Sequence, residues 1–542
     1  MKKILATCGI LLFGLLLRLY HNTDISLWHD EAFSALLIKY PWGEMFYRIG
    51  LDVHPPVYYV ALRVWSMFVG DSLLALRGFS IFFGLGTAYM AFRFVKDIVQ
   101  NERAAFLALL AIALNPFQIQ YATEARMYTF GAFLAVSAAY ALCRGLQNTG
   151  KQQWRWMLGF GALSALAALT HYYLLFTVAA LGFYALVSFW LIHRTQVRAY
   201  GPLAAAYAII IATFIPWTSW FVYQYKQVGA GYWIPPLDNW SIPTTLWQLF
   251  TGMEVDIHKV SSQVGVIAVS IGIVSALSIF AIRSKAAHKW LVLLLSAAPF
   301  LGALAFALLA HLKGQDSSVY LVRYFLYASA FLFIGLSLSL DMLKQSRIVF
   351  AGMLLYLCVC VLVFTNYWHK LDITHKPGMR AAVEYLQSHT YPNDKLFVGS
   401  SFEFFNLKYY LSQVAPPQPT PAPATMSSGQ FSLEDLSDDA QTAHPIPPTR
   451  GWPKPLLFSG GNTSIRNLPH FAGTAILTDA DLLPRFEDGA GPGDTVWVLW
   501  TNSFGGSKPA TPKDWKQVDE AGFAEVRPYV GTWIIITKYL VQ

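Results

Sequence analysis

Two adjacent carboxylates, Asp30 and Glu31, follow the first apolar segment of the chain, in the aromatic sequence of residues 28–33. A carboxylate held close to a hydroxyl group can act as a general base. Because neighbouring side chains point in different directions on a helix, one carboxylate would act as the base while the other caps or orients the helix. We predict that both are catalytic; an acidic first turn stabilised by the helix dipole is the alternative.

A histidine followed by two prolines, His54-Pro55-Pro56, precedes Tyr58 and a second tyrosine. Proline is favoured at the start of a helix, where it fixes the chain and would present His54 at the helix N-terminus. Helix N-termini bind phosphate groups through their available backbone N–H groups. We therefore predict that His54 contacts a phosphate and that Tyr58 positions a substrate; a rigid turn with an incidental histidine is the alternative.

A third motif runs from Glu124 to Tyr128 and contains Arg126. Side chains two positions apart do not face each other on a helix, so Glu124 and Arg126 are each available for a contact elsewhere. We predict that Arg126 binds phosphate, and that Glu124 and Tyr128 position a substrate. A local ion pair is the less favoured alternative.

Two more polar residues, His171 and Arg323, lie at the ends of apolar segments. Arginine can bind phosphate through two parallel hydrogen bonds, so we predict that Arg323 does so; snorkelling to lipid headgroups is the alternative. His171, which precedes Tyr172, fits a structural histidine well. Positioning of a substrate is the functional role that we predict for it.

The composition of the 542 residues indicates a membrane protein. Hydrophobic residues make up 55% of the chain and charged residues 13%, with a mean hydropathy of +0.41. Soluble domains have about 25% charged residues, so this chain could not cover a water-exposed surface of its size. The net charge of +8 comes from Lys and Arg in short segments between apolar stretches. They form no patch interleaved with aromatic residues, which argues against a nucleic-acid partner.

Apolar stretches of about 20 residues, long enough to cross a bilayer, recur along the first two thirds of the chain. We predict about eleven membrane spans, at residues 4–20, 74–94, 104–120, 127–145, 156–171, 172–192, 203–222, 262–282, 290–310, 322–340 and 348–366.

The cations in the short loops set the orientation, because cytoplasmic loops are enriched in Lys and Arg. A cytoplasmic N-terminus puts every cluster of these cations on the cytoplasmic side: Lys2 and Lys3; Arg93, Lys96 and Arg103; Arg144, Lys151 and Arg155; Arg194 and Arg198; Arg283, Lys285 and Lys289; Lys344 and Arg347. The C-terminal region is then outside.

Three regions are predicted to be external: a first loop at 21–73, a loop at 223–261 and the tail. We divide the chain into a transmembrane catalytic domain, 1–366, and an extracytoplasmic domain, 367–542. Residues 32–40 and 57–68 of the first loop are predicted to form amphipathic helices at the membrane interface. The tail shows a helical pattern at 378–387 and strand patterns at 395–398, 494–499 and 531–537, typical of a small α/β domain. A proline-rich flexible insertion is predicted at 415–449.

All the singled-out side chains are therefore expected at the external membrane face, although they come from distant parts of the sequence. A reaction between a membrane-anchored phosphate donor and an external acceptor requires such a convergence. We find no metal-ligand spacing and predict that no cofactor is required, while a divalent metal is not excluded.

On three motifs taken in order, the chain resembles the GT-C membrane glycosyltransferases. These are the Asp30-Glu31 pair, His54-Pro55-Pro56 with its tyrosines, and the Glu124 to Tyr128 sequence. The resemblance is to bacterial relatives of the protein O-mannosyltransferases and of the lipid A aminoarabinose transferase, and it is close over the N-terminal third. The lipid A enzymes have lysine where His54 stands, so a lysine contact to phosphate is not carried over.

The resemblance implies a polytopic α-helical membrane protein of the plasma (inner) membrane with a small C-terminal α/β extracytoplasmic domain. It implies an inverting transfer of a sugar from a polyprenyl phosphate donor to a hydroxyl of an envelope lipid, glycan or protein. Asp30 would be the base, and His54, Arg126 and Arg323 would meet the phosphate charge. The alternative from another class is a transporter or flippase of lipid-linked sugars, but no clear internal repeat is visible.

Overall fold

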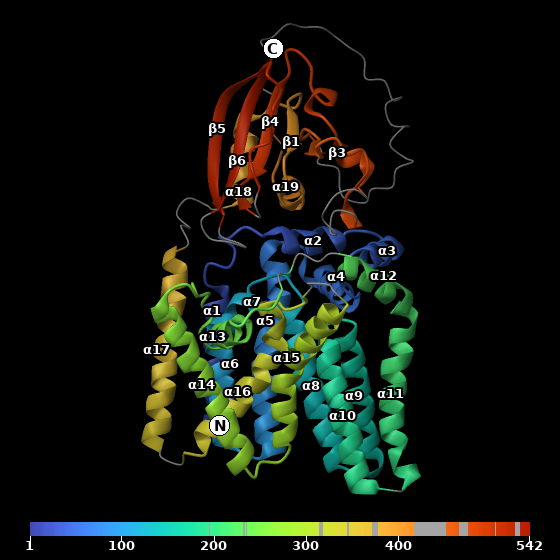
Figure 1. The fold of residues 1–542 in the computed structure, drawn as a ribbon, viewed down its shortest axis with the longest axis vertical. Helices are drawn as coiled ribbons and strands as arrows, with labels where there is room; N and C mark the ends of the chain where they lie inside the picture. Colours follow the sequence, from blue (N-terminus) through green and yellow to red (C-terminus); the bar gives the residue numbers. More distant parts are fainter. Residues whose placement is uncertain are drawn as a thin grey trace. The chain divides into compact units, whose positions relative to one another are not determined.

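The computed structural model describes residues 1–194, 196–230, 234, 236–313, 318–343, 346–370, 378–416, 451–465, 475–503, 506–525 and 532–542 (Figure 1). It divides into two compact units. The first comprises Met1–Asn22 and Val53–His369, and the second Thr23–Asp52 and Lys370–Gln542. The predicted insertion at 415–449 lies outside the described residues from 417 onward.

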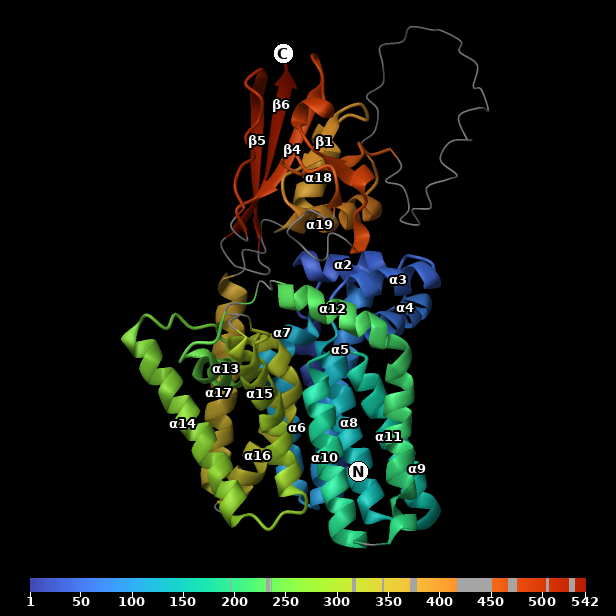
Figure 2. The same ribbon diagram turned by 45° about the vertical axis from the view of Figure 1, so that its right-hand side comes forward.

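The first unit is helical throughout its described part. Its helices are α1 (Lys2–Leu19), α4 (Val57–Val69), α5 (Leu73–Arg93), α6 (Glu102–Leu114), α7 (Pro116–Ala122), α8 (Tyr128–Gln147), α9 (Gly150–Ala168), α10 (Leu174–His193), α11 (Gly201–Phe214), α12 (Thr218–Ala230), α13 (Ser241–Thr251), α14 (Val260–Arg283), α15 (Lys289–Leu312), α16 (Leu326–Asp341) and α17 (Ser346–Lys370). Figure 2 shows α9, α10 and α11 packed together on one side of this unit.

Each of the eleven predicted spans overlaps a helix of this unit. Among the described residues, seven segments are long and apolar enough to cross a membrane, or eight if α6 and α7 are counted as one bent span. The number of eleven crossings stays a prediction. The seven segments are Leu73–Val99, Tyr128–Gln147, Leu174–His193, Val197–Val228, Val260–Arg283, Lys289–Leu312 and Val322–Asp341.

The predicted span at 104–120 consists of two helices, because α6 and α7 meet at a bend of 54°. Pro116 cannot continue α6, but it fits the start of α7. Asn115 caps α7 by accepting a hydrogen bond of 2.9 Å from the backbone N–H of Gln118. Arg18 donates to the carbonyl of Ala113 at the end of α6, at 2.6 Å. A side chain thus forms a hydrogen bond with the end of α6 and another with the start of α7. The bend between them sets the direction of the loop after α7.

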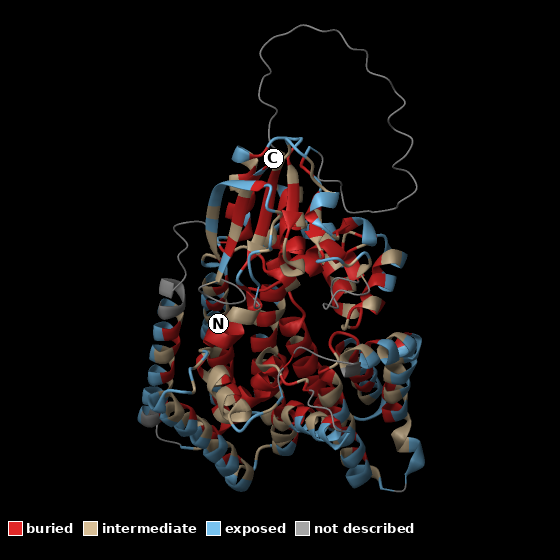
Figure 3. Ribbon diagram, turned by 45° about the horizontal axis from the view of Figure 1, so that its top comes forward, coloured by how far each residue is buried: buried red, intermediate tan, exposed pale blue. Residues whose placement is uncertain are grey.

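Helices α8 and α16 form the interior of the first unit. In the apolar segments that contain them, 83% of the residues are buried, against 17% for α14. Figure 3 shows the exposed residues gathered on the outer helices and the buried ones inside. The outer helices carry exposed apolar side chains that suit contact with lipid, as a membrane domain requires.

The second unit contains a six-stranded sheet of order β3-β2-β1-β4-β6-β5. Strands β3, β2, β1 and β4 are parallel, and β6 pairs antiparallel with both β4 and β5. The elements of this unit are α2 (His29–Leu37), α3 (Trp42–Leu51), α18 (Met379–His389), β1 (Lys395–Val398), α19 (Ser401–Gln413), β2 (Pro455–Phe458), β3 (Leu482–Leu483), β4 (Thr495–Thr501), β5 (Trp515–Glu525) and β6 (Thr532–Val541). The predicted small α/β domain is confirmed, although β2, β3 and β5 were not predicted.

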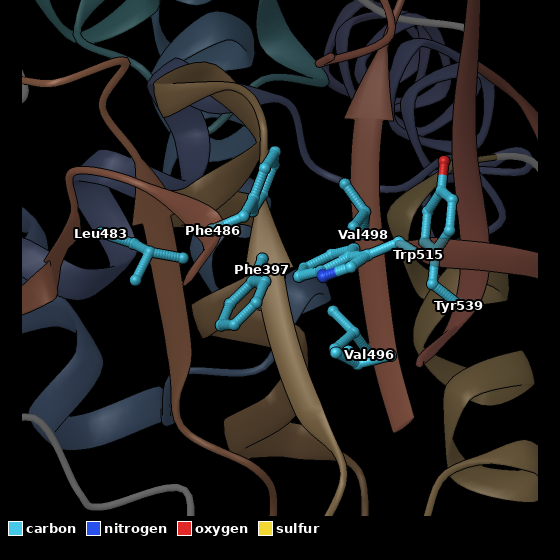
Figure 4. Close-up of a cluster of buried hydrophobic side chains, with 8 residues drawn as sticks. Phe397, Leu483, Phe486, Val496, Val498, Trp515 and Tyr539 are labelled. Carbon is cyan, nitrogen blue, oxygen red and sulfur yellow. The ribbon is translucent and has the colours of Figure 1, made fainter. Parts of the chain in front are cut away.

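An aromatic core holds this sheet together (Figure 4). The rings of Phe458 and Phe486 stack at 4.1 Å, and Trp515 lies 5.2 Å from Phe486. Stacked and edge-on rings add to the free energy gained by burying their area. Residues from β1, β3, β4, β5 and β6 meet in this core: Phe397, Leu483, Phe486, Val496, Val498, Trp515, Tyr539 and Val541.

The segment Thr23–Asp52 belongs to the second unit, whereas we expected the whole loop 21–73 to belong to the membrane domain. Helix α2 packs on α19. The ring of His29 stacks on Phe405 at 5.0 Å, and its Nδ1 lies 3.1 Å from the carbonyl oxygen of Phe402. The apolar face that suggested a membrane-interface helix is therefore buried against α19.

Two buried carboxyl groups, Glu403 of α19 and Glu525 at the end of β5, share a hydrogen bond in the second unit. Burial raises the pKa of Glu403 well above its ordinary value, and the charge of Glu525 raises it further. Glu525 accepts a hydrogen bond from the hydroxyl of Thr501 at 3.0 Å. Glu403 therefore carries the proton and links α19 to the sheet.

This pair predicts that the second unit loses stability as the pH rises. A carboxyl group whose pKa is raised by folding stabilises the fold fully when the pH is below its pKa in the unfolded chain, here 4.5. This contribution is lost as the pH rises through the pKa of the group in the folded protein. We expect the melting temperature of the full chain in detergent, followed by tryptophan fluorescence, to fall as the pH rises above the unfolded pKa of 4.5 and through the raised pKa of Glu403.

The Glu403→Gln variant should show a smaller fall of the melting temperature with pH, because glutamine keeps the hydrogen-bond donor but does not ionise. Glu487→Gln, at an exposed position, is the matched control and should show the same fall as the wild type. A Glu403→Gln profile as steep as that of the wild type would contradict the shared proton.

Candidate functional site

Four basic residues of the first unit each lie just before a helix. His54 precedes α4, Arg126 precedes α8, His171 precedes α10, and Arg323 lies in a short 3-10 helix that leads into α16. We call these four residues the basic cluster. Helix N-termini carry a partial positive charge, so their position favours an anion.

Direct contacts join three members of the basic cluster. The Nη2 of Arg126 lies 3.5 Å from the Nε2 of His54. The rings of His54 and His171 are 5.6 Å apart between centroids. Residues separated by more than 100 positions in the sequence are thus brought together by the packing of α4, α8 and α10.

Two tyrosines connect Arg323 to the others. Its guanidinium carbon lies 5.9 Å from the ring centroid of Tyr128 and 6.0 Å from that of Tyr324. The His171 ring lies 4.6 Å from the ring of Tyr324 and 6.2 Å from that of Tyr128. Aromatic faces near a guanidinium group stabilise its charge without neutralising it.

Hydrogen bonds from neighbouring helices hold the backbone around His54. The N–H of Val57 donates to the carbonyl of Leu169 at 2.9 Å, which ties the start of α4 to the end of α9. The Nε2 of Gln224 in α12 donates to the carbonyl of His54 at 3.3 Å. Gln224 in turn accepts from the hydroxyl of Tyr172. His54 is therefore held in place through its backbone.

The electrostatics of the basic cluster make His171 neutral. Its pKa is held well below the ordinary value by burial, and then by the charges of His54, Arg126 and Arg323. The N–H of Tyr173 donates to its Nδ1 at 3.2 Å. The proton of the neutral ring is then on Nε2, which can donate a hydrogen bond to an acceptor.

The predicted positioning residues Glu124 and Tyr58 are both buried. Glu124 lies in the tight turn of Arg126, whose N–H donates to the carbonyl of Glu124 at 2.8 Å. Tyr58 packs edge-on against Tyr59 at 5.2 Å and against Phe79 at 5.8 Å, in the aromatic contact of α4 with α5. Tyr58 therefore has a packing role, and its action on a substrate stays a prediction, as does that of Glu124.

The two adjacent carboxylates lie in the second unit, in the first turn of α2. Glu31 is fully buried, and its Oε2 accepts from the N–H of Trp28 at 3.4 Å, as a capping residue does. Asp30 is partly exposed. The expected division, in which one carboxylate caps the helix, fits Glu31, and the catalytic roles of both stay predictions.

Sequence reasoning missed two residues around the basic cluster, Gln224 and Tyr327. The ring of Tyr327 lies 5.6 Å from that of His171. Its spacing of three from Tyr324 places both on one helical face, which is a signal that the sequence does contain. Gln224 has no comparable signal. In the described part of the chain, no group of three His, Cys, Asp or Glu residues could hold a metal.

Gly131 of α8 gives a structural test of this packing, because a Cβ there would lie 2.6 Å from the Tyr327 ring and 2.8 Å from Leu174. We expect Gly131→Ala to destabilise the protein by about 1–3 kcal/mol through overpacking. Thermal unfolding in detergent would measure the loss. Gly159→Ala in α9, where no atom lies within 4 Å, is the control and should not destabilise. Equal stability of the two variants would contradict the close approach of α8 and α16.

The chain is similar to known proteins in sequence and in fold. Residues 53–220 match the family described as dolichyl-phosphate-mannose-protein mannosyltransferase. No curated protein sequence matches the chain.

The structure of ArnT from Cupriavidus metallidurans bound to undecaprenyl phosphate is similar, with 12% identity and a TM-score of 0.57, over 98% of this chain and 97% of that one. The apo state of that protein gives 14% identity and a TM-score of 0.55, over 99% and 98%. The chain therefore has the ArnT-like GT-C fold, as predicted.

Proposed function

We propose that this chain, a GT-C protein related to ArnT and to the protein O-mannosyltransferases, transfers a sugar from a polyprenyl phosphate donor to a hydroxyl acceptor. The observation that carries the proposal is the basic cluster, with two arginines and two histidines at helix N-termini of a membrane domain. Arginines and helix N-termini together favour the binding of an anion such as the phosphate of a lipid donor.

The basic cluster would bind the donor phosphate in the ground state and the leaving phosphate after transfer. Arg126 and Arg323 can each donate two hydrogen bonds to phosphate oxygens. His54 and the Nε2 of His171 add single donors. Donors that are already in place stabilise the charge that develops on the leaving group, and this effect is a large part of catalysis in many enzymes.

The base of the proposed reaction is Asp30. It would take the proton of the acceptor hydroxyl while the hydroxyl oxygen attacks the anomeric carbon from the side opposite the phosphate. The bond between that carbon and the phosphate oxygen breaks, and the polyprenyl phosphate leaves with the electron pair. The configuration is inverted in a single displacement. Glu31 would act with Asp30 by holding the first turn of α2.

The remaining predicted residues would position the substrates. Tyr128 borders the basic cluster and His171 belongs to it, and both are suited to contact the donor, while Glu124 and Tyr58 support the loops that carry Arg126 and His54. The reaction would take place on the external face of the plasma (inner) membrane, with a cytoplasmic N-terminus and an extracytoplasmic C-terminal domain.

The ArnT structure contains undecaprenyl phosphate, which makes that lipid a suitable first donor carrier to test. Envelope lipids, glycans and proteins are the acceptor classes.

The role of Asp30 predicts that Asp30→Asn folds and inserts normally but loses transfer. A positioned base contributes about 100- to 10,000-fold to a rate, so kcat should fall by that factor. Transfer from a radiolabelled polyprenyl phosphate sugar by the purified protein would measure it. Asp514→Asn, an exposed carboxylate of the same unit, is the control. Unimpaired transfer by Asp30→Asn would remove Asp30 from the mechanism.

The role of Arg323 predicts a selective effect on the donor. Loss of a charged hydrogen bond should raise the KM for the donor about 10- to 100-fold in Arg323→Ala and change the KM for the acceptor little. Arg323→Lys should recover part of the affinity, because lysine keeps the charge but not the two-pronged geometry. Arg283→Ala, at an exposed end of α14, is the control. Equal increases in both KM values would argue against a phosphate contact.

A further inference from the structure

Tyr327 is a fully buried tyrosine of α16 with an unusual hydroxyl group. The side chain has 0% of its surface exposed, and its hydroxyl has no hydrogen-bond partner among the described residues. Buried polar groups in folded proteins are nearly always hydrogen-bonded, so an exception calls for an explanation.

Packing limits the movement of the Tyr327 ring. The ring lies so close to α8 that a Cβ on Gly131 would come within 2.6 Å of it. The ring of His171 lies 5.6 Å away on another side. Because the interior is close-packed, the ring cannot swing toward a different partner without moving α8 or α16.

The hydroxyl of Tyr327 lies within electrostatic range of two arginines of the basic cluster, Arg126 and Arg323, and of the hydroxyls of Tyr128 and Tyr324. In the described part of the chain, the Tyr327 hydroxyl has no hydrogen-bond acceptor of its own. An anion bound by both arginines would supply one.

We propose that the Tyr327 hydroxyl donates a hydrogen bond to a phosphate oxygen of the lipid donor, and so acts as a fifth phosphate-contacting group beside the basic cluster. This inference rests on the proposed function and adds a donor residue to it. Binding of the phosphate then satisfies a hydroxyl that has no partner among the residues that the structure describes, so the hydrogen bond contributes to donor affinity without replacing a bond to any of them.

Two other buried tyrosines show why Tyr327 stands apart. The hydroxyl of Tyr320 donates to the Oγ1 of Thr245 at 2.8 Å and so has a structural partner. The hydroxyl of Tyr173 is unpaired within the described part of the chain, as that of Tyr327 is. The ring of Tyr173, however, packs against Phe176 at 5.3 Å and Phe325 at 5.5 Å, and the arginines contribute to the electrostatic surroundings of Tyr327 and not to those of Tyr173.

The test compares Tyr327→Phe with Tyr173→Phe in the full-length protein in detergent. Each variant removes one unpaired buried hydroxyl and keeps the ring. Undecaprenyl phosphate is the probe, with undecaprenol as the probe without phosphate. We expect Tyr327→Phe to weaken binding of undecaprenyl phosphate about 10- to 100-fold, the factor for a hydrogen bond to a charged group, and Tyr173→Phe to bind as the wild type does.

Melting temperatures of the same variants separate a phosphate contact from a structural role. Removing a hydroxyl that has no partner should leave the melting temperature of Tyr327→Phe unchanged or raise it. Unchanged binding, a loss no larger than that of Tyr173→Phe, or a clear fall in melting temperature would each overturn the inference. If the wild type binds undecaprenol as tightly as undecaprenyl phosphate, the proposed function fails, and this inference fails with it.

Discussion

The gathering of positive charge at the basic cluster is the constraint that the first unit must meet. Arg126 and Arg323 cannot lose their protons, and three helix N-termini add partial positive charge beside them. The surrounding structure holds these groups together all the same. The capped bend between α6 and α7 directs the loop of Arg126, and Gln224 fixes the backbone of His54. A site built in this way favours an anion, and this preference underlies the function that we propose.

The second unit contains two buried groups that would be negatively charged, and a shared proton removes their repulsion. Glu403 and Glu525 are two buried groups that would repel each other as carboxylates, but one of them keeps a proton and the pair becomes a hydrogen bond. Arginines have no such solution at physiological pH. The two acids can therefore form a structural link by sharing a proton, while the arginines keep a charge to which an anion can bind. The comparison explains why the basic cluster is a candidate binding site and the carboxyl pair a structural link.

Sequence reasoning found the residues of the site more readily than their surroundings. Periodicity located β1 and the helices of the membrane domain, and motif chemistry singled out the whole basic cluster. It did not find the bend at Asn115, although Asn115-Pro116 is a local signal for a helix start, because the apolar residues on both sides of it read as one continuous span. Sequence reasoning also assigned Thr23–Asp52 to the membrane domain. An apolar helical face has the same sequence pattern whether it contacts lipid or another helix, here α19. Gln224 acts through a backbone carbonyl, a contact that leaves no pattern in the sequence.

A structure of the full-length protein with a bound polyprenyl phosphate would test the central claim most directly. We expect phosphate oxygens to lie about 2.7–2.9 Å from the guanidinium nitrogens of Arg126 and Arg323, as in hydrogen bonds between charged groups, with His54 beside them. A phosphate bound elsewhere, with both arginines out of hydrogen-bonding reach of it, would contradict the account.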